Sequence, residues 1–306
     1  MYEKFFGIRE NPFAVSPDPR FLVPTQETNE AFASLTYCVT QRRGFVLLSG
    51  EVGTGKTTIL NKFLEWLAEA RTPTAFVFNP RLNVSEFLDF VLADFGIPCD
   101  SDMKSRQLIQ LNRWLVDRYR VNETAVLIVD EAQNLSTEVL EEIRLLTNLE
   151  TSRGKLLQIV LAGQPELESK LRHPDLRQLR QRITLRCRIA SLTLKQVEAY
   201  INERLRIAGL EGRPVFSLLA VKAIYDYSQG IPRLINLICD QALIAAYAEG
   251  RRWVPEGIIH LIGNDFDLFS QPTSVGIDPT SGIQAREDAV REAFPDADEQ
   301  LANWNK

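Results

Sequence analysis

The sequence lacks several features that would assign it to a specialised class of protein. No apolar run reaches the roughly 18 residues of a membrane-spanning helix, and the first residues do not form a signal peptide. Only two histidines are present, His173 and His260, so a histidine-based zinc site or a catalytic triad has little support. We therefore expect a cytoplasmic protein without a signal peptide, a membrane-spanning helix or a histidine-based site.

Basic charge and paired cysteines are also scarce. The 35 Lys and Arg residues are outnumbered by 40 Asp and Glu, a net charge of −5, so no overall positive field indicates nucleic-acid binding, although a local basic patch stays open. The cysteines at 38, 99, 187 and 239 are scattered and form no C-x-x-C pair, which favours reduced, buried thiols. A hydrophobic content of 45% in 306 residues is enough for one large domain or two modest ones.

One short segment carries the strongest functional signal. Residues 50–57 read G-E-V-G-T-G-K-T and match the phosphate-binding pattern G-x-x-x-x-G-K-[ST]. An apolar run precedes the segment and an amphipathic helical pattern follows it, as a strand–loop–helix corner requires. The glycines let the loop wrap a phosphate chain, and backbone N–H groups at the helix start attract it. The expected phosphate-binding residues are Gly50, Glu51, Val52, Gly53, Thr54, Gly55, Lys56, Thr57 and Thr58.

Two carboxylates follow a second apolar run, 125–129, and complete a candidate active site. We expect Lys56 to reach the β- and γ-phosphates, and Thr57 and Asp130 to hold Mg²⁺. Glu131 is then placed to polarise an attacking water as a general base. Gln164, after the run 157–162, is a candidate for orienting this water, although a capping or turn role fits its spacing equally well.

Arginines near the end of this region admit two interpretations. Arg177, Arg180 and Arg182 can form a solvated helix face, or they can act as arginine fingers on the nucleotide of a neighbouring subunit, with Arg182 the first candidate and Arg180 the second. Further along, Pro232 suits the first position of a helix, and Arg233 beside it could contact the γ-phosphate.

Alternating strand and helix patterns predict an α/β fold. Strands are expected at 45–49, 75–78, 125–129 and 157–162, with a weaker one at 183–187, forming a mostly parallel sheet between helices, a three-layer P-loop architecture. After Thr193, a helix cap, the pattern is helical only, with later helices at 215–228 and 232–250.

Four regions follow from these patterns. Residues 1–28 are expected to be an ordered, extended arm rich in Phe and Pro, and a helix from 29 to 42 opens the α/β domain, which runs to 190. Residues 191–269 are expected to form a helical lid domain. Residues 270–306 carry seven acidic and three basic residues, and we expect a flexible tail with one short helix near 285–294.

Together these motifs resemble the AAA+ ATPases, and more narrowly the general secretion pathway protein A (ExeA-type) family. The resemblance covers about residues 1–268. The segments that carry it are FFGIRENPF (5–13), PDPRFL (17–22), DEAQNL (130–135), LAGQPEL (161–167), LRQLRQRI (176–183) and GIPR (230–233).

The resemblance implies ATP hydrolysis with Mg²⁺, nucleotide-dependent homo-oligomerisation through arginine fingers, and a role in building envelope machinery such as a secretion or pilus system. A peripheral position at the inner membrane is an alternative to a purely cytoplasmic one. By the same resemblance, Asn11, Pro12 and Phe13 of the arm and Ile231 and Arg233 of the lid border the nucleotide. Secretion-type members continue into a membrane span and a periplasmic peptidoglycan-binding domain, and neither is expected in this sequence.

Two alternatives stay open. The same core resembles transposition regulators of the TniB and TnsC type, which assemble on DNA, and basic residues such as those at 42–43, 177–182 and 251–252 could contact it. A nucleotide-dependent scaffold that does not hydrolyse ATP is the other alternative, and Glu131 argues against it.

Overall fold

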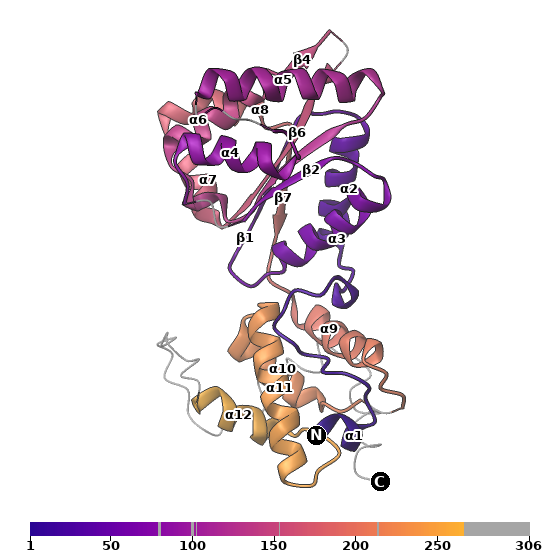
Figure 1. The fold of residues 1–306 in the computed structure, drawn as a ribbon. Coiled ribbons are helices and arrows are strands. Elements are labelled where there is room, and N and C mark those ends of the chain that lie inside the picture. Colours follow the sequence, from indigo (N-terminus) through magenta and orange to yellow (C-terminus); the bar gives the residue numbers. More distant parts are fainter. Residues whose placement is uncertain (79–80, 99–100, 102, 153, 213, 266–306) are drawn as a thin grey trace. The chain divides into compact units, whose positions relative to one another are not determined.

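The computed structural model describes residues 1–78, 81–98, 101, 103–152, 154–212 and 214–265 (Figure 1). They form two compact units. We call residues 24–190 the sheet unit, and residues 1–23 together with 191–265 the helical unit. The predicted tail at 270–306 and residue Cys99 lie outside the described residues.

A five-stranded parallel sheet forms the centre of the sheet unit. The strands lie in the order β2 (Thr74–Val77), β3 (Ala125–Val129), β6 (Leu157–Gly163), β1 (Phe45–Gly50) and β7 (Leu185–Ile189). Every residue of β1, β3 and β6 is buried, as expected for parallel strands covered on both faces. Because all strands run in the same direction, their carboxyl ends meet at one edge. β6 lies between β1 and β3 at that edge.

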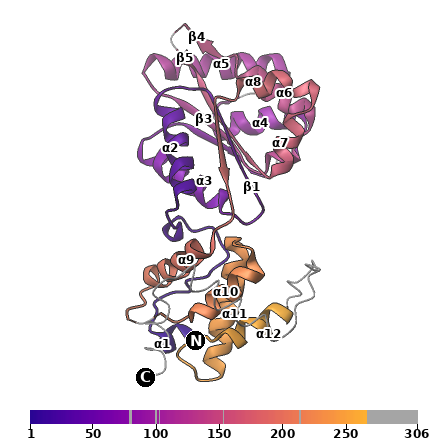
Figure 2. The ribbon, with the colours of Figure 1, turned by 180° about the vertical axis from the view of Figure 1, so that it is seen from behind.

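Helices cover both faces of this sheet. α2 (Gln26–Thr40) and α3 (Lys56–Glu69) lie on one face, and α4 to α8 gather on the opposite face, as Figures 1 and 2 show from two sides. The bounds of the second group are α4 (Val84–Asp94), α5 (Lys104–Arg120), α6 (Thr137–Leu146), α7 (Pro165–Leu171) and α8 (Arg177–Arg182). Short pieces complete the unit: η2 (Ala132–Asn134), β4 (Glu150–Thr151), β5 (Gly154–Lys155) and η3 (Pro174–Leu176).

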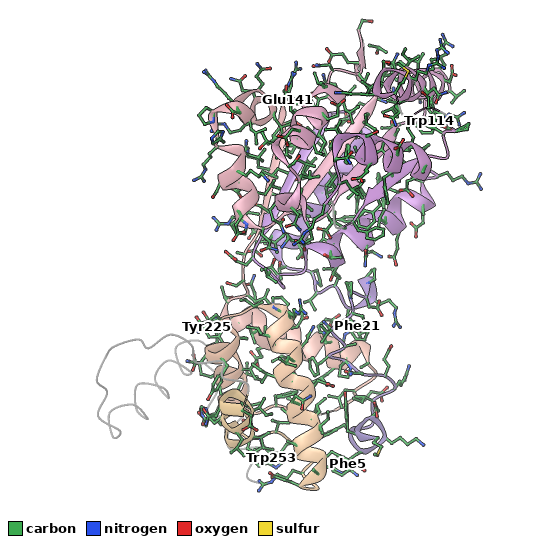
Figure 3. All side chains as sticks on the ribbon, turned by 60° about the vertical axis from the view of Figure 1, so that its left-hand side comes forward. Phe5, Phe21, Trp114, Glu141, Tyr225 and Trp253 are labelled. Atoms are coloured by element: carbon green, nitrogen blue, oxygen red, sulfur yellow. The ribbon has the colours of Figure 1, made fainter. Side chains whose placement is uncertain are left out.

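The helical unit is built from both ends of the described chain. Its helices are α1 (Tyr2–Phe6), η1 (Pro19–Phe21), α9 (Leu194–Ile207), α10 (Leu218–Ser228), α11 (Pro232–Ala248) and α12 (Glu256–Asp265). Side chains from the first 23 residues and from all four later helices share one apolar core. Within this unit Phe21 and Phe5, both labelled in Figure 3, lie at opposite ends.

A buried arginine fastens the N-terminal segment to this unit. Arg204 of α9 is 5% exposed, and its guanidinium donates hydrogen bonds to the backbone oxygen of Pro12 (2.5 Å), the hydroxyl of Tyr200 (2.6 Å) and the backbone oxygen of Ala14 (3.4 Å). It also lies 4.8 Å from the ring centre of Phe21. A buried charge is costly unless its donors are satisfied, so these contacts make the segment an integral part of the unit.

Several predicted boundaries were wrong. The N-terminal segment is not extended throughout, because α1 forms and ends at Gly7, whose φ of 77° is left-handed. α2 starts before residue 29, since Thr25 and Thr28 form a capping box ahead of it. The last strand is β7, two residues later than 183–187, because α8 continues to Arg182. The mostly parallel sheet and the helical C-terminal region are confirmed.

The described residues contain neither a membrane-spanning helix nor a group of three or more metal ligands. No helix among them combines the length and apolar character that crossing a bilayer requires. Within the same residues, no group of three or more His, Cys, Asp or Glu side chains could hold a metal ion.

Cys38, Cys187 and Cys239 are free thiols, and burial raises the pKa of Cys38 to about 12, which makes it unreactive.

Candidate nucleotide site

The predicted phosphate-binding loop joins the end of β1 to the start of α3. Gly55 is the N-cap of α3 and adopts φ 97°, a left-handed conformation that a residue with a Cβ reaches only under strain. Thr54 is buried and its hydroxyl donates to the backbone oxygen of Glu51 (2.8 Å), while Glu51 and Val52 are exposed. The loop therefore has the strand–loop–helix geometry that the sequence predicted.

Lys56 is buried in this loop. The residue is 5% exposed, and its ammonium donates to the backbone oxygens of Gly50 (2.8 Å) and Glu51 (2.9 Å). Burial lowers the pKa of Lys56, and the carboxylates of Glu131 and Asp130 partly oppose this shift. The ammonium is thus held at the loop by neutral carbonyls, which an incoming phosphate could replace as partners.

Thr57 and Asp130 meet at the carboxyl edge of the sheet. The Thr57 hydroxyl donates to Asp130 Oδ2 at 3.0 Å, although the residues are far apart in sequence. Burial raises the pKa of Asp130, and hydrogen bonds from the Glu131 N–H and from Thr57 oppose the shift. A hydroxyl and a carboxylate side by side are hard oxygen donors, which fit a Mg²⁺ ion that keeps waters and phosphate oxygens as its other ligands.

Glu131 follows Asp130 in an uncommon backbone conformation. Its φ is 52°, in the left-handed region, and such strain often marks functional positions. Its Oε2 accepts hydrogen bonds from two side-chain amides, those of Gln133 and, at 3.1 Å, Gln164. Gln164 occupies the N-cap position of α7 but makes no capping hydrogen bond with its side chain, which contacts Glu131 instead.

The order of the strands explains why these residues meet. β6 separates β1, which precedes the phosphate-binding loop, from β3, which precedes Asp130. A side chain that follows β6 must therefore lie between the two motifs, and Gln164 occupies that place. The sheet thus brings Lys56, Thr57, Asp130, Glu131 and Gln164 to one edge.

Sequence reasoning missed two residues of this edge. Gln133 contacts both Glu131 and Gln164, and the ammonium of Lys170 donates to the backbone oxygens of Gln133 and Leu135. Gln133 lies within the segment DEAQNL, so its position was visible, but no role followed from the spacing alone.

The candidate arginine fingers lie away from these side chains. Arg177, Arg180 and Arg182 are exposed on α8, and Arg182 donates to the side-chain oxygen of Asn148 (3.1 Å). In the part of the chain that the structure describes, none of the three forms an ion pair or a hydrogen bond with the loop or with Asp130–Glu131. Their proposed action on a neighbouring subunit stays a prediction.

The remaining predicted residues belong to the helical unit. The Asn11 amide donates to Asp240 (3.1 Å), Pro12 accepts from Arg204, and Phe13 is 1% exposed and packs edge-on against Phe216. In the same unit Ile231 is the N-cap of α11, Pro232 occupies its first turn, and Arg233 is exposed. Their contacts with a nucleotide stay predictions.

Comparison with known proteins identifies the class of this site. A family model described as an AAA domain matches residues 39–171. The chain is 46% identical over 262 residues to general secretion pathway protein A of Aeromonas hydrophila, covering 85% of this chain and 48% of that protein. It therefore spans about half the length of this relative. A second relative, the ATP-dependent DNA helicase Pif1 of a Psychrobacter species, is 32% identical over 39% of this chain and 18% of its own length.

A solved structure supports the fold. The Aeropyrum pernix ORC2 protein in its ADPNP–ADP complexes matches with a TM-score of 0.63 and 18% identity, over 94% of this chain and 84% of that chain. At this identity the similarity establishes the fold alone. Together with the loop geometry and the AAA domain match, it shows an AAA+ P-loop fold, in a chain that is similar to general secretion pathway protein A over 85% of its length.

Proposed function

We propose that the protein binds ATP with Mg²⁺ and hydrolyses it to ADP and phosphate. The observation that carries this proposal is the contact between Thr57 and Asp130 at 3.0 Å, with Glu131 directly beside it. Thr57 and Asp130 would hold the ion, which would neutralise charge that develops on the phosphates. Lys56 would bind the β- and γ-phosphates once its ammonium leaves the carbonyls of Gly50 and Glu51.

Glu131 would act as the general base. Its carboxylate would accept a proton from the water that attacks the γ-phosphorus, and Gln164, whose amide already contacts Glu131, would help to orient that water. The P–O bond to ADP breaks as the new bond forms. We also infer that Asn11, Pro12, Phe13, Ile231 and Arg233 border the bound nucleotide, as the family resemblance implies.

We propose further that the protein works as a homo-oligomer. Arg177, Arg180 and Arg182 are exposed and unpaired with carboxylates among the described residues, so one of them can reach the nucleotide of a neighbouring subunit. The relationship to general secretion pathway protein A supports a role in assembling an envelope secretion or pilus system, from the cytoplasmic side and in peripheral contact with the inner membrane.

The ATPase rate per subunit tests these proposals when it is measured against protein concentration, with and without double-stranded DNA, at low and physiological salt. We expect a rate that climbs with concentration and ignores DNA. Strong stimulation by DNA that weakens with salt would instead favour the transposition-type regulator. A complete absence of turnover under all conditions would contradict ATP hydrolysis.

Mixing two inactive variants tests the arginines directly. Arg182→Ala keeps an intact nucleotide site, and Lys56→Ala keeps an intact arginine, so a mixture should recover activity that neither variant has alone. Arg120→Ala, at an exposed arginine of α5 that pairs with Asp117, is the matched control and should be active by itself. If the mixture stays inactive while Arg180→Ala or Arg177→Ala complements Lys56→Ala, the finger is one of those residues.

A further inference from the structure

The side-chain amide of Gln133 bridges the two parts of the nucleotide site that come from different strands. Its nitrogen donates to Glu131 Oε2, and its oxygen accepts from the backbone N–H of Gln164 at 3.1 Å. One side chain therefore links the residue after β3 with the residue after β6. Gln133 contacts no residue of the phosphate-binding loop through a hydrogen bond among the described residues, so it belongs to the Glu131 side of the site alone.

Both contacts of Gln133 require one orientation of its amide. The backbone N–H of Gln164 can only donate, so it must face the amide oxygen, and the amide nitrogen then faces the carboxylate of Glu131. The close approach depends on Gly163, because a Cβ at that position would lie 2.8 Å from Gln133 Oε1. The glycine thus leaves room for this amide at the end of β6.

The backbone around Gln133 is fixed as well. Lys170, on α7, donates to the backbone oxygens of Gln133 (3.3 Å) and Leu135. α7 begins directly after Gln164. The segment η2 is therefore joined to both ends of α7 by hydrogen bonds between side chains and backbone groups.

This arrangement distinguishes the two oxygens of the Glu131 carboxylate. Oε2 accepts both amide hydrogen bonds, whereas Oε1 accepts none among the described residues. A general base needs one oxygen aimed at the water and a fixed orientation, in the same way that a third group orients the base of a catalytic triad. We propose that Gln133 is a positioning residue that, together with Gln164, fixes the Glu131 carboxylate so that Oε1 faces the attacking water.

This inference rests on the proposed ATP hydrolysis, and its test separates the two. Gln133→Ala should lower kcat by about 10- to 100-fold, the loss expected when a reacting group is misplaced by about 1 Å. The Kd for ADP, measured with a fluorescent analogue, should stay within about twofold, because Gln133 does not touch the loop that binds phosphate. Asn134→Ala, at the exposed neighbouring position in η2, is the matched control and should keep the wild-type kcat.

The split between kcat and ADP affinity distinguishes positioning from a general loss of structure. Gln133→Glu keeps the shape of the side chain and can still accept from the Gln164 N–H, but its carboxylate cannot donate to Glu131 Oε2. Its kcat should fall as for Gln133→Ala, while the Kd for ADP stays near the wild-type value. A variant with a damaged fold would lose ADP affinity as well.

The outcomes have separate meanings. Wild-type protein without turnover would remove the proposed hydrolysis itself. Active wild-type protein together with an unchanged or raised kcat for Gln133→Ala or for Gln133→Glu would overturn the role of Gln133 and leave ATP hydrolysis in place. If Gln133→Ala does not fold, Gln133→Glu with wild-type ADP affinity still decides the question.

Discussion

The two units of this protein are built in opposite ways. The sheet unit is one continuous stretch of chain, and its chemistry collects where parallel strands end, with Lys56, Thr57, Asp130 and Glu131 at one edge. The helical unit is assembled from two separate segments and relies on a buried cation, Arg204, that binds backbone oxygens of the N-terminal segment. We therefore expect substitutions in the first unit to remove function without removing the fold, and substitution of Arg204 to lower the stability of the second.

The largest effect is expected in the sheet unit. Lys56→Ala should reduce kcat by at least about 10²- to 10³-fold, as for loss of a single preorganised donor, and should weaken ATP binding as well, so that its loss in kcat/KM exceeds that of any other variant. The fold should be untouched, so the far-UV circular dichroism spectrum should match that of the wild type. Turnover at the wild-type rate in this variant would show that the loop is not the nucleotide site.

Glu131→Gln separates binding from chemistry within the same unit. A general base contributes about 10²- to 10⁴-fold, so kcat should fall by that amount while ATP still binds. Unhydrolysed ATP should then accumulate on the protein, and oligomers should persist in size-exclusion chromatography with ATP. Normal hydrolysis in Glu131→Gln would mean that another group activates the water.

Arg204→Ala tests whether the buried arginine stabilises the helical unit. It leaves the backbone oxygens of Pro12 and Ala14 without their charged donor, at a cost of about 2–3 kcal/mol in the free energy of unfolding. Chemical denaturation followed by far-UV circular dichroism should begin at lower denaturant than in the wild type, because the helical unit unfolds first.

Arg206→Ala is the matched control for this variant. Arg206 lies two residues further along α9, with a side chain that is 69% exposed and paired with Glu203. Exposed pairs contribute little, so its denaturation midpoint should stay near that of the wild type. Equal midpoints for Arg204→Ala and Arg206→Ala would show that the buried network does not stabilise the unit.

The smallest expected effect is the pH dependence of nucleotide binding. Burial lowers the pKa of Lys56, so its ammonium loses its proton as the pH rises through a value below the usual range for lysine. The charged form binds phosphate, and the Kd for ADP should therefore rise several-fold on the alkaline side, approaching tenfold per pH unit. Lys56→Arg cannot lose its proton and should remove this dependence wherever it still binds ADP.

The sequence predicted the sheet unit well because its signals are local. The strand predicted at 125–129 was correct at both ends, because an unbroken apolar run is typical of a strand that is buried on both faces of a parallel sheet. Thr57 and Asp130 were expected to be neighbours, and they share a hydrogen bond. The role of Gln133 was not predicted, because it depends on β3 lying beside β6, and spacing along the chain does not reveal the order of the strands.

The helical unit was harder to predict for the same reason. Arg204 lies in register with the buried residues Val197, Tyr200 and Ile201 on α9, so the helical pattern did place a cation on the apolar face. Its partners, however, are backbone oxygens roughly 190 residues earlier in the chain. No periodic pattern identifies such partners, which is why the N-terminal segment was described as an arm and not as part of a core.

The distance along the chain between partners in the helical unit has a consequence for synthesis. The hydroxyl of Tyr2 bonds to Asp240, which is 238 residues further along. At typical translation rates the N-terminal segment waits roughly 10 to 50 seconds for this partner. During that interval the sheet unit can complete its fold, whereas Tyr2, Phe6 and Phe13 have no core to enter. A nascent chain of this protein therefore exposes an aromatic segment until α9 to α12 leave the ribosome.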